Sequence, residues 1–263
     1  MFYKQYKLDK FQEEAINSIE QNHSVIVAAP TGAGKTLIAE YALEKHLQSG
    51  KQIVYTSPIK ALSNQKYRDF CKEYDEKIGI ITGDVVINDN APVLIMTTEI
   101  LRNIIFDDIS RLNDVHYVIF DEIHYIDDIE RGTVWEECII FAPQHINFIC
   151  LSATIPNLRE FASWMQSVRH NKIDMVIETH RPVPLEHKLY FHGYGLGGLN
   201  ELKDLQKNAD IISVKMNRGR NNRQAQQSET SAVALESPNQ GIVQIDGVDL
   251  IEHIQFNNQL PCL

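Results

Sequence analysis

The stretch Ala29-Pro30-Thr31-Gly32-Ala33-Gly34-Lys35-Thr36 decides the fold of this chain because of what flanks it. It follows the apolar run 25–28 and precedes an amphipathic segment that begins near Leu37. A strand, a glycine-rich loop and a helix in this order form a phosphate cradle of backbone N–H groups at a helix N-terminus. Lys35 would reach the β and γ phosphates, and the Thr36 hydroxyl would be a ligand of Mg²⁺. The sequence therefore predicts a nucleotide site at Pro30, Thr31, Gly32, Ala33, Gly34, Lys35 and Thr36.

Short β-branched runs alternate with helical patterns around this loop. Strands are expected at 25–28, 53–56, 78–82, 93–97, 115–120, 147–151 and 172–178. Helices are expected at 9–21, 37–48, 59–74, 98–105, 134–141 and 156–165. Apolar strands separated by helices of crossover length predict an α/β fold with a mostly parallel sheet, helices on both faces and ligands at the carboxyl ends of the strands.

Three helix ends carry local signals. Asp9 and Gln12 have the spacing of a capping box, and Gly50 follows the end of a helical pattern. The pair Ser57-Pro58 predicts an N-cap serine with proline at the first helical position.

Composition narrows the class of protein. With 263 residues and 43% hydrophobic content, the chain has enough apolar side chains for a large core. No apolar run approaches the ~20 residues of a membrane span, and the N-terminus is too polar for a signal peptide, so we expect a soluble intracellular protein in a compartment left open. The four cysteines lie far apart, which favours reduced thiols over zinc or disulfides. The net charge of -10 disfavours a nucleic-acid partner without excluding a local track.

Two carboxylates follow another hydrophobic strand, in the run Phe120-Asp121-Glu122-Ile123-His124. Beside a phosphate loop, Asp121 would hold Mg²⁺ and Glu122 would orient the attacking water. The tripeptide Ser152-Ala153-Thr154 follows a further strand, where its hydroxyls would bond to the acidic motif and sense the nucleotide. Taken alone, such residues are ordinary turn formers.

The order of these segments resembles the first RecA-like domain of superfamily two helicases. The further segments that carry the resemblance are Phe11-Gln12, Ser57-Pro58-Ile59-Lys60-Ala61-Leu62, Ile81-Thr82-Gly83-Asp84 and Thr97-Thr98-Glu99-Ile100-Leu101-Arg102. The likeness narrows to the superkiller-type DExH-box RNA helicases that feed RNA to exosomes, and it spans roughly residues 6–191. Its narrower motifs are Asp121-Glu122-Ile123-His124-Tyr125, Glu130-Arg131-Gly132-Thr133-Val134-Trp135-Glu136-Glu137, Leu151-Ser152-Ala153-Thr154-Ile155-Pro156-Asn157 and Arg181-Pro182-Val183-Pro184-Leu185-Glu186-His187.

The resemblance also implies the domain organisation. Residues 1–191 are expected to form a RecA-like P-loop NTPase domain, the first ATP-binding domain of a helicase. The stretch 192–258, with clustered glycines and a polar run free of aromatics, reads as a partly disordered linker. Residues 259–263 resemble the truncated start of a second RecA-like domain, so its arginine fingers are expected to be missing from this chain.

Roles of individual residues follow from the family. Gln12 would read adenine and Tyr6 would stack on its ring, while His124, Ser152 and Thr154 would couple nucleotide to strand. Single-stranded nucleic acid would lie across Pro58, Lys60, Gly83, Thr97, Thr98 and Arg102. Structural alternatives stay open: Lys60 and Arg102 as solvated helix residues, and Thr97 or Thr98 as helix caps. Trp135 is expected in the core rather than at a ligand.

The implied function is that of an ATP-dependent RNA helicase N-terminal domain, which couples ATP hydrolysis to RNA binding, translocation and unwinding once a second lobe completes it. ATP and Mg²⁺ would be the cofactors, with single-stranded RNA and RNA-degradation machinery as partners and no membrane. The isolated chain would hydrolyse ATP weakly or not at all. A DNA helicase of the same superfamily, a binding module without turnover, and a phosphate-loop kinase or transporter ATPase are the alternatives.

Overall fold

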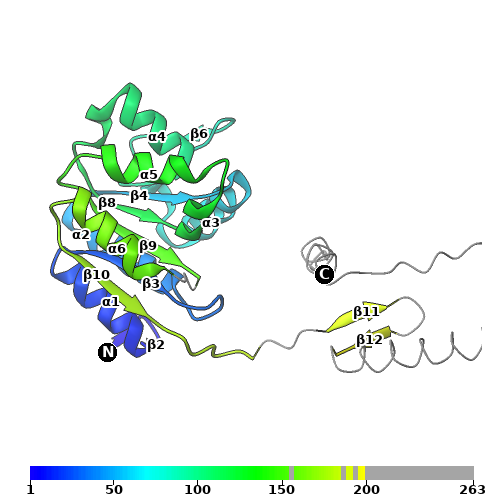
Figure 1. Cartoon of the computed structure of the whole chain (residues 1–263). Helices are drawn as coiled ribbons and strands as arrows, with labels where there is room; N and C mark the ends of the chain where they lie inside the picture. Colours follow the sequence, from blue (N-terminus) through cyan, green and yellow to red (C-terminus); the bar gives the residue numbers. More distant parts are fainter. Residues whose placement is uncertain (154–156, 185–187, 192–194, 199–263) are drawn as a thin grey trace, which may run out of the picture. The chain divides into compact units, whose positions relative to one another are not determined.

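The computed structural model describes residues 1–153, 157–184, 188–191 and 195–198 (Figure 1). The chain divides into two units, Met1–Leu185 and Glu186–Leu263. In the first unit an eight-stranded sheet has the order β10-β3-β9-β8-β4-β7-β5-β6, parallel throughout except for β6. Its strands are β3 (Ser24–Ala28), β4 (Gln52–Ser57), β5 (Ile78–Ile81), β6 (Val86–Ile87), β7 (Val93–Thr97), β8 (Val115–Phe120), β9 (Asn147–Ser152) and β10 (Ile173–Ile177). All seven expected strands are present.

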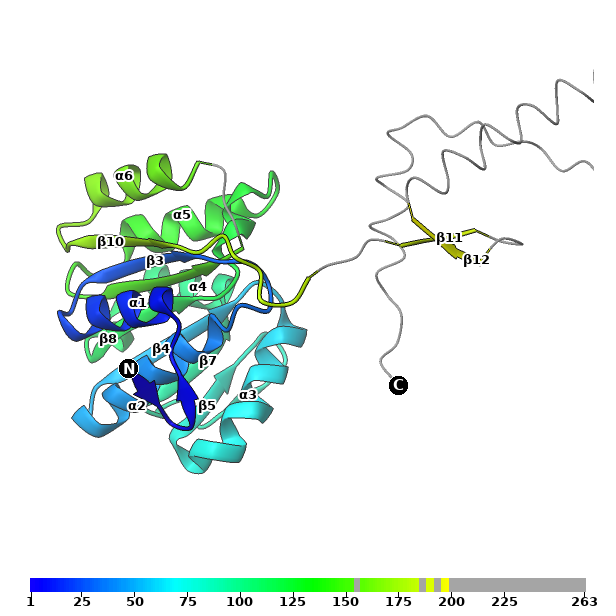
Figure 2. The ribbon, with the colours of Figure 1, turned by 90° about the horizontal axis from the view of Figure 1, so that it is seen from below.

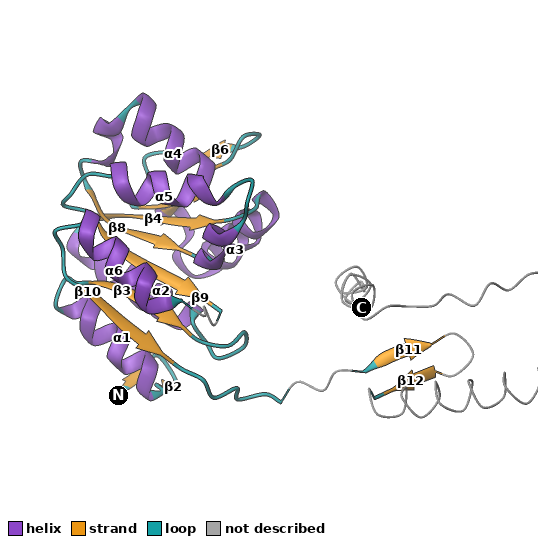
Figure 3. Ribbon diagram, viewed as in Figure 1, coloured by secondary structure: helices purple, strands orange, loops and turns teal. Residues whose placement is uncertain are grey.

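Helices cover both faces of the sheet, as the sequence predicts (Figures 2 and 3). One face packs against α1 (Lys10–Glu20), α2 (Thr36–Ser49) and α3 (Lys60–Tyr74). The other packs against α4 (Thr98–Asp107), α5 (Gly132–Phe141) and α6 (Leu158–Val168). Neighbouring strand residues point to opposite faces, so Val25 and Val27 join the first core and Ile26 joins the second. Burial on both faces explains why the inner strands β3, β9, β8 and β7 are mostly apolar.

The sequence analysis did not predict several short strands and 3-10 turns. A hairpin of β1 (Phe2–Tyr3) and β2 (Tyr6–Lys7) precedes α1, and β6 pairs antiparallel with β5. Three 3-10 turns were also not foreseen: η1 (Asp75–Lys77), η2 (Ile109–Leu112) and η3 (Ile123–Asp127). Strands of two residues leave no periodicity to detect. The first hairpin is held instead by Lys4, whose ammonium pairs with Glu40, Glu44 and Glu73.

Two of the three predicted helix ends are confirmed. The Asp9 N–H donates a 2.9 Å hydrogen bond to Oε1 of Gln12. Gly50 ends α2 with a φ of 71°, a left-handed conformation that glycine adopts without strain. The prediction for Ser57-Pro58 is wrong, because α3 begins at Lys60 after an extended Ile59. The Ser57 hydroxyl is occupied by a buried 2.6 Å hydrogen bond with that of Ser63.

The second unit is described only in part. There β11 (Leu189–Phe191) and β12 (Gly195–Gly197) form an antiparallel hairpin on either side of the expected boundary at residue 191. The rest of the expected linker (192–194 and 199–258) and the segment 259–263 lie outside the described residues. Within the part of the chain that is described, no helix is both long and apolar enough to cross a membrane.

Candidate active site

The predicted site residues gather at the carboxyl edge of the sheet in two adjoining groups. The loops after β3, β9 and β8, which are neighbours in the sheet, carry the predicted nucleotide residues. The loops after β4, β7 and β5, also neighbours, carry the predicted nucleic-acid residues. Because β4 lies beside β8, the two groups meet at the centre of the sheet.

The loop between β3 and α2 has the backbone expected of a phosphate cradle. Gly32 and Gly34 have φ angles of 86° and 89°, a backbone conformation that residues other than glycine rarely adopt. Lys35 is only 9% exposed, and its ammonium donates to the carbonyls of Ala29 at 2.7 Å and Pro30 at 3.2 Å. Burial lowers the pKa of Lys35, and the charges of Glu122 and Asp121 oppose that change. The lysine and the acidic pair therefore lie on the same edge of the sheet, in the loops after β3 and β8.

Gln12 is tied to this loop directly. Its Nε2 donates a 3.1 Å hydrogen bond to the carbonyl of Gly34, and the side chain is 5% exposed. A Cβ atom at Gly34 would lie 2.8 Å from the same nitrogen. Gln12 thus supports the phosphate loop as well as α1. Tyr6 lies exposed in β2.

The acidic pair follows β8 in a constrained turn. The Asp121 N–H donates to the carbonyl of Thr56, and the buried Tyr55 hydroxyl donates to Asp121 Oδ2 at 2.5 Å. Burial, together with the Asp121 carboxylate, raises the pKa of Tyr55 well above its usual value. Glu122 has a φ of 53°, a left-handed conformation that is uncommon for glutamate and concentrates at functional sites. His124 Nδ1 lies 3.3 Å from Glu122 Oε2 without forming a hydrogen bond.

Lys66 is a site residue that the sequence analysis missed. Its ammonium donates to the Thr36 hydroxyl at 3.2 Å and lies 4.0 Å from Asp121 Oδ2. The two oxygens predicted to hold Mg²⁺ therefore face a single cation, and hydroxyl and carboxylate oxygens are ligands that Mg²⁺ prefers. Its position could have signalled this role, because Lys66 lies on α3 between Ser63 and Phe70, the two buried residues of that helix.

The predicted nucleic-acid residues differ in exposure. Lys60 is exposed, pairs with Asp84 at 2.6 Å and lies beside Gly83. Thr97 and Thr98 are buried at the start of α4, where Thr97 holds the N-cap position without a side-chain cap bond. Their side chains are therefore not exposed to a nucleic-acid strand.

Two further residues that were predicted to contact nucleic acid have partners within the protein. Arg102 donates from Nε to Glu137, with its guanidinium 5.2 Å from the Phe106 ring centre. The buried Pro58 offers its carbonyl to Arg131, a residue to which the motif resemblance assigned no role.

The remaining predicted residues lie near β9 and α5. The Ser152 hydroxyl is buried and has no hydrogen-bond partner among the residues that the structure describes. Thr154 lies outside the described residues. Trp135, a residue of α5, is fully buried in the core, as predicted.

Comparison with known proteins identifies related sequences. The sequence profile described as DEAD/DEAH box helicase matches residues 9–161. "Antiviral helicase SKI2" of Saccharomyces cerevisiae is 53% identical over 182 residues, which cover 69% of this chain and 14% of the relative. "DExH-box ATP-dependent RNA helicase DExH11" of Arabidopsis thaliana is 48% identical, covering 80% of this chain and 16% of the relative. "Exosome RNA helicase MTR4" of Homo sapiens is 48% identical, covering 80% and 20%. The chain thus spans 14% to 20% of the length of these relatives.

Solved structures share the fold. Helicase Lhr of Mycobacterium smegmatis, bound to ssDNA and AMP-PNP, has a TM-score of 0.53 at 24% identity, covering 64% of this chain and 25% of that one. The Hef helicase domain of Pyrococcus furiosus has a TM-score of 0.51 at 22% identity, covering 67% and 41%.

Proposed function

This chain belongs to the DEAD/DEAH box helicase family, and on that premise we propose that residues 1–191 form the first ATP-binding domain of a superkiller-type RNA helicase. Its resemblance to that type, read from the motifs, is confirmed by the relatives at 48% to 53% identity. The domain would bind ATP with Mg²⁺ and couple its hydrolysis to movement along single-stranded RNA. RNA-degradation machinery would be its partner in the cell.

The observation that carries this proposal is the meeting of phosphate loop and acidic pair. Lys66 contacts Thr36 and faces Asp121. The charges of Glu122 and Asp121 also raise the pKa of Lys35, against the effect of its burial. In the proposed mechanism Lys35 would bind the β and γ phosphates, Thr36 and Asp121 would hold Mg²⁺, and Glu122 would orient the attacking water. Bound Mg²⁺ would supply charge neutralisation to the phosphates. His124, Ser152 and Thr154 would relay the nucleotide state.

The single-stranded RNA would cross the loops after β4, β5 and β7. Backbone amides at the start of α4 and the Lys60 ammonium are suited to phosphate oxygens. Such backbone contacts carry little sequence information, so the domain would accept many RNA sequences.

Turnover would require a second lobe. Arginine fingers contribute about 10³–10⁵-fold to phosphoryl transfer in related ATPases. We therefore propose that residues 1–263 bind ATP and RNA, hydrolyse ATP slowly and separate no duplex unless a second lobe is supplied.

The test measures binding of a fluorescent ATP analogue and of labelled single-stranded RNA to residues 1–263. Lys35→Ala should weaken nucleotide binding at least about tenfold, whereas Lys10→Ala at an exposed position should not. Equal nucleotide affinity in both variants, or the absence of RNA binding, would overturn the proposal. A DNA strand of matched sequence that binds more tightly than RNA would favour the DNA helicase instead.

A further inference from the structure

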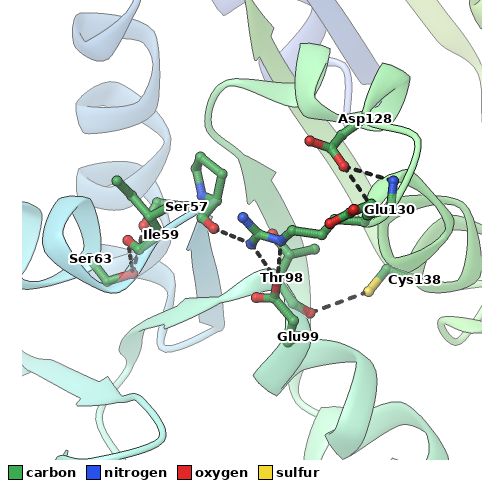
Figure 4. Close-up of polar contacts among 10 residues, drawn as sticks. Ser57, Ile59, Ser63, Thr98, Glu99, Asp128, Glu130 and Cys138 are labelled. Carbon is green, nitrogen blue, oxygen red and sulfur yellow. Dashed lines mark hydrogen bonds and ion pairs between the residues drawn. The ribbon is translucent and has the colours of Figure 1, made fainter. Parts of the chain in front are cut away.

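We propose that Arg131 is a positioning residue for the bound strand: it neutralises Glu99 at the start of α4 and ties that helix to Pro58. This inference rests on the proposed function. Figure 4 labels Glu99, to which this arginine donates, and Asp128 and Glu130 of the turn that precedes it, with polar contacts as dashed lines.

The loop before α5 is built to present Arg131 in one position. Asp128 Oδ1 accepts hydrogen bonds from the N–H groups of Glu130 at 3.0 Å and of Arg131 at 2.9 Å. The Gly132 N–H donates to the Asp128 carbonyl at 2.8 Å. A Cβ at Gly132 would lie 2.1 Å from the carbonyl oxygen of Ile126, so no side chain fits there. The turn therefore has little freedom.

From this turn, the guanidinium reaches two segments that are far apart in the sequence. Nε donates to Glu99 Oε1 at 3.1 Å, and Nη2 donates to the same oxygen and to the Pro58 carbonyl. The guanidinium carbon lies 5.7 Å from the centre of the Trp135 ring. A planar group with several donors can satisfy both partners at once, which an ammonium does less well.

The pairing with Arg131 matters because Glu99 carries a negative charge at the N-terminus of α4. Glu99 is in the first turn of α4, where the exposed N–H groups and partial positive charge of a helix attract anions. An unpaired carboxylate there would compete with an RNA phosphate and repel it. The Glu99 and Arg131 side chains are 37% and 35% exposed, so both are accessible from solvent. Arg131 cancels the negative charge and holds the α4 terminus against the Pro58 loop.

A role in charge neutralisation differs from a structural role in what a second substitution does. If Arg131 only supported the fold, removing Glu99 as well would not restore RNA binding to Arg131→Met. If Arg131 acts by neutralising Glu99, the double variant should regain affinity, because the offending carboxylate is gone.

The experiment measures the affinity of residues 1–263 for a labelled oligouridylate by fluorescence anisotropy at several salt concentrations. Arg131→Met should weaken binding about tenfold, and Glu99→Gln should bind at least as tightly as the unchanged protein. The double variant should recover to within about threefold of the unchanged protein. Arg111→Met is the matched control: it removes an arginine of η2 that pairs with Asp89, and it should change affinity less than about twofold.

Nucleotide binding separates the possible failures. Affinity for a fluorescent ATP analogue should stay unchanged in all variants, since Arg131 has no contact with the phosphate loop among the described residues. Absence of RNA binding by the unchanged protein refutes the proposed function itself. Unchanged RNA affinity in Arg131→Met, or a double variant as weak as that single variant, refutes only the role of Arg131. If Arg131→Met does not fold, weaker RNA binding by Glu99→Gln overturns the inference by itself.

Discussion

The hydroxyl of Tyr55 donates a 2.5 Å hydrogen bond to Oδ2 of Asp121, and this contact joins the nucleotide group of the site to the nucleic-acid group. Tyr55 lies in β4, the strand that leads to Pro58 on the proposed nucleic-acid side. Asp121 follows β8 on the nucleotide side. A change in what Asp121 binds would therefore act directly on the strand that positions the Pro58 loop.

Replacing Tyr55 by Phe should destabilise the protein without disturbing its packing. The ring contact with Phe70, at a centroid distance of 5.5 Å, would remain while the hydrogen bond to the carboxylate is lost. We expect the free energy of unfolding in urea to fall by about 1.5–3 kcal/mol. Tyr6→Phe, at an exposed tyrosine, should change it by less than about 0.5 kcal/mol. Equal effects of the two substitutions would contradict this assignment.

Replacing Lys66 by Gln should make the nucleotide-free protein respond to Mg²⁺. The ammonium faces the Thr36 and Asp121 oxygens that the metal would use, so the two cations compete. Thermal unfolding without nucleotide should shift upward with added Mg²⁺ more in Lys66→Gln than in the unchanged protein. Lys72→Gln removes a charge from the exposed side of the same helix and should behave like the unchanged protein. A metal response identical in all three proteins would exclude this competition.

Arg169 should be essential for stability, because it satisfies buried carbonyls between α5 and β9. Its guanidinium donates to the carbonyls of Ile139, Ala142, Pro143 and Ile146 at 2.7–3.4 Å. Burial lowers its pKa to about 10, which still leaves it charged at neutral pH. Arg169→Met should lower the free energy of unfolding in urea by about 2–4 kcal/mol, since it leaves these buried carbonyls without a hydrogen-bond donor. Arg159→Met, at an exposed position of α6, is the control, and a similar cost there would refute the interpretation.

His116 should make stability decrease in mild acid. Burial, together with the charge of Lys51, lowers its pKa to about 4 in the folded protein, against 6.5 in a model peptide. The unfolded chain therefore binds more protons between these values. This contribution is complete above pH 6.5 and is lost as the pH falls towards 4.

The measurement is the urea midpoint of unfolding as a function of pH. His116→Gln should show a shallower loss below pH 6.5 than the unchanged protein, although the buried His46 beside it, whose pKa is also lowered, retains a share. His180→Gln, at an exposed position, should leave the acid limb unchanged. An acid limb that is unaltered in His116→Gln would disprove this origin.

Several contacts at the site could not be predicted because they join residues distant in the sequence. Tyr55 reads as an ordinary strand residue, and only the pairing of β4 with β8 brings its hydroxyl to Asp121. The sequence analysis assigned no role to Lys66 or Arg131, although each contacts two separate segments of the site. Ser57 was predicted as a helix cap from local spacing, but a hydroxyl of the helix itself competes for it.

By itself, the sequence determined the α/β class, the seven main strands and the phosphate loop, because hydrophobic periodicity and glycine spacing are local properties of the chain. Only the tertiary structure decided which charges meet at the carboxyl edge: Lys66 against Thr36 and Asp121, and Arg131 between Glu99 and Pro58. The order of strands in the sheet, which no local pattern encodes, sets those neighbours.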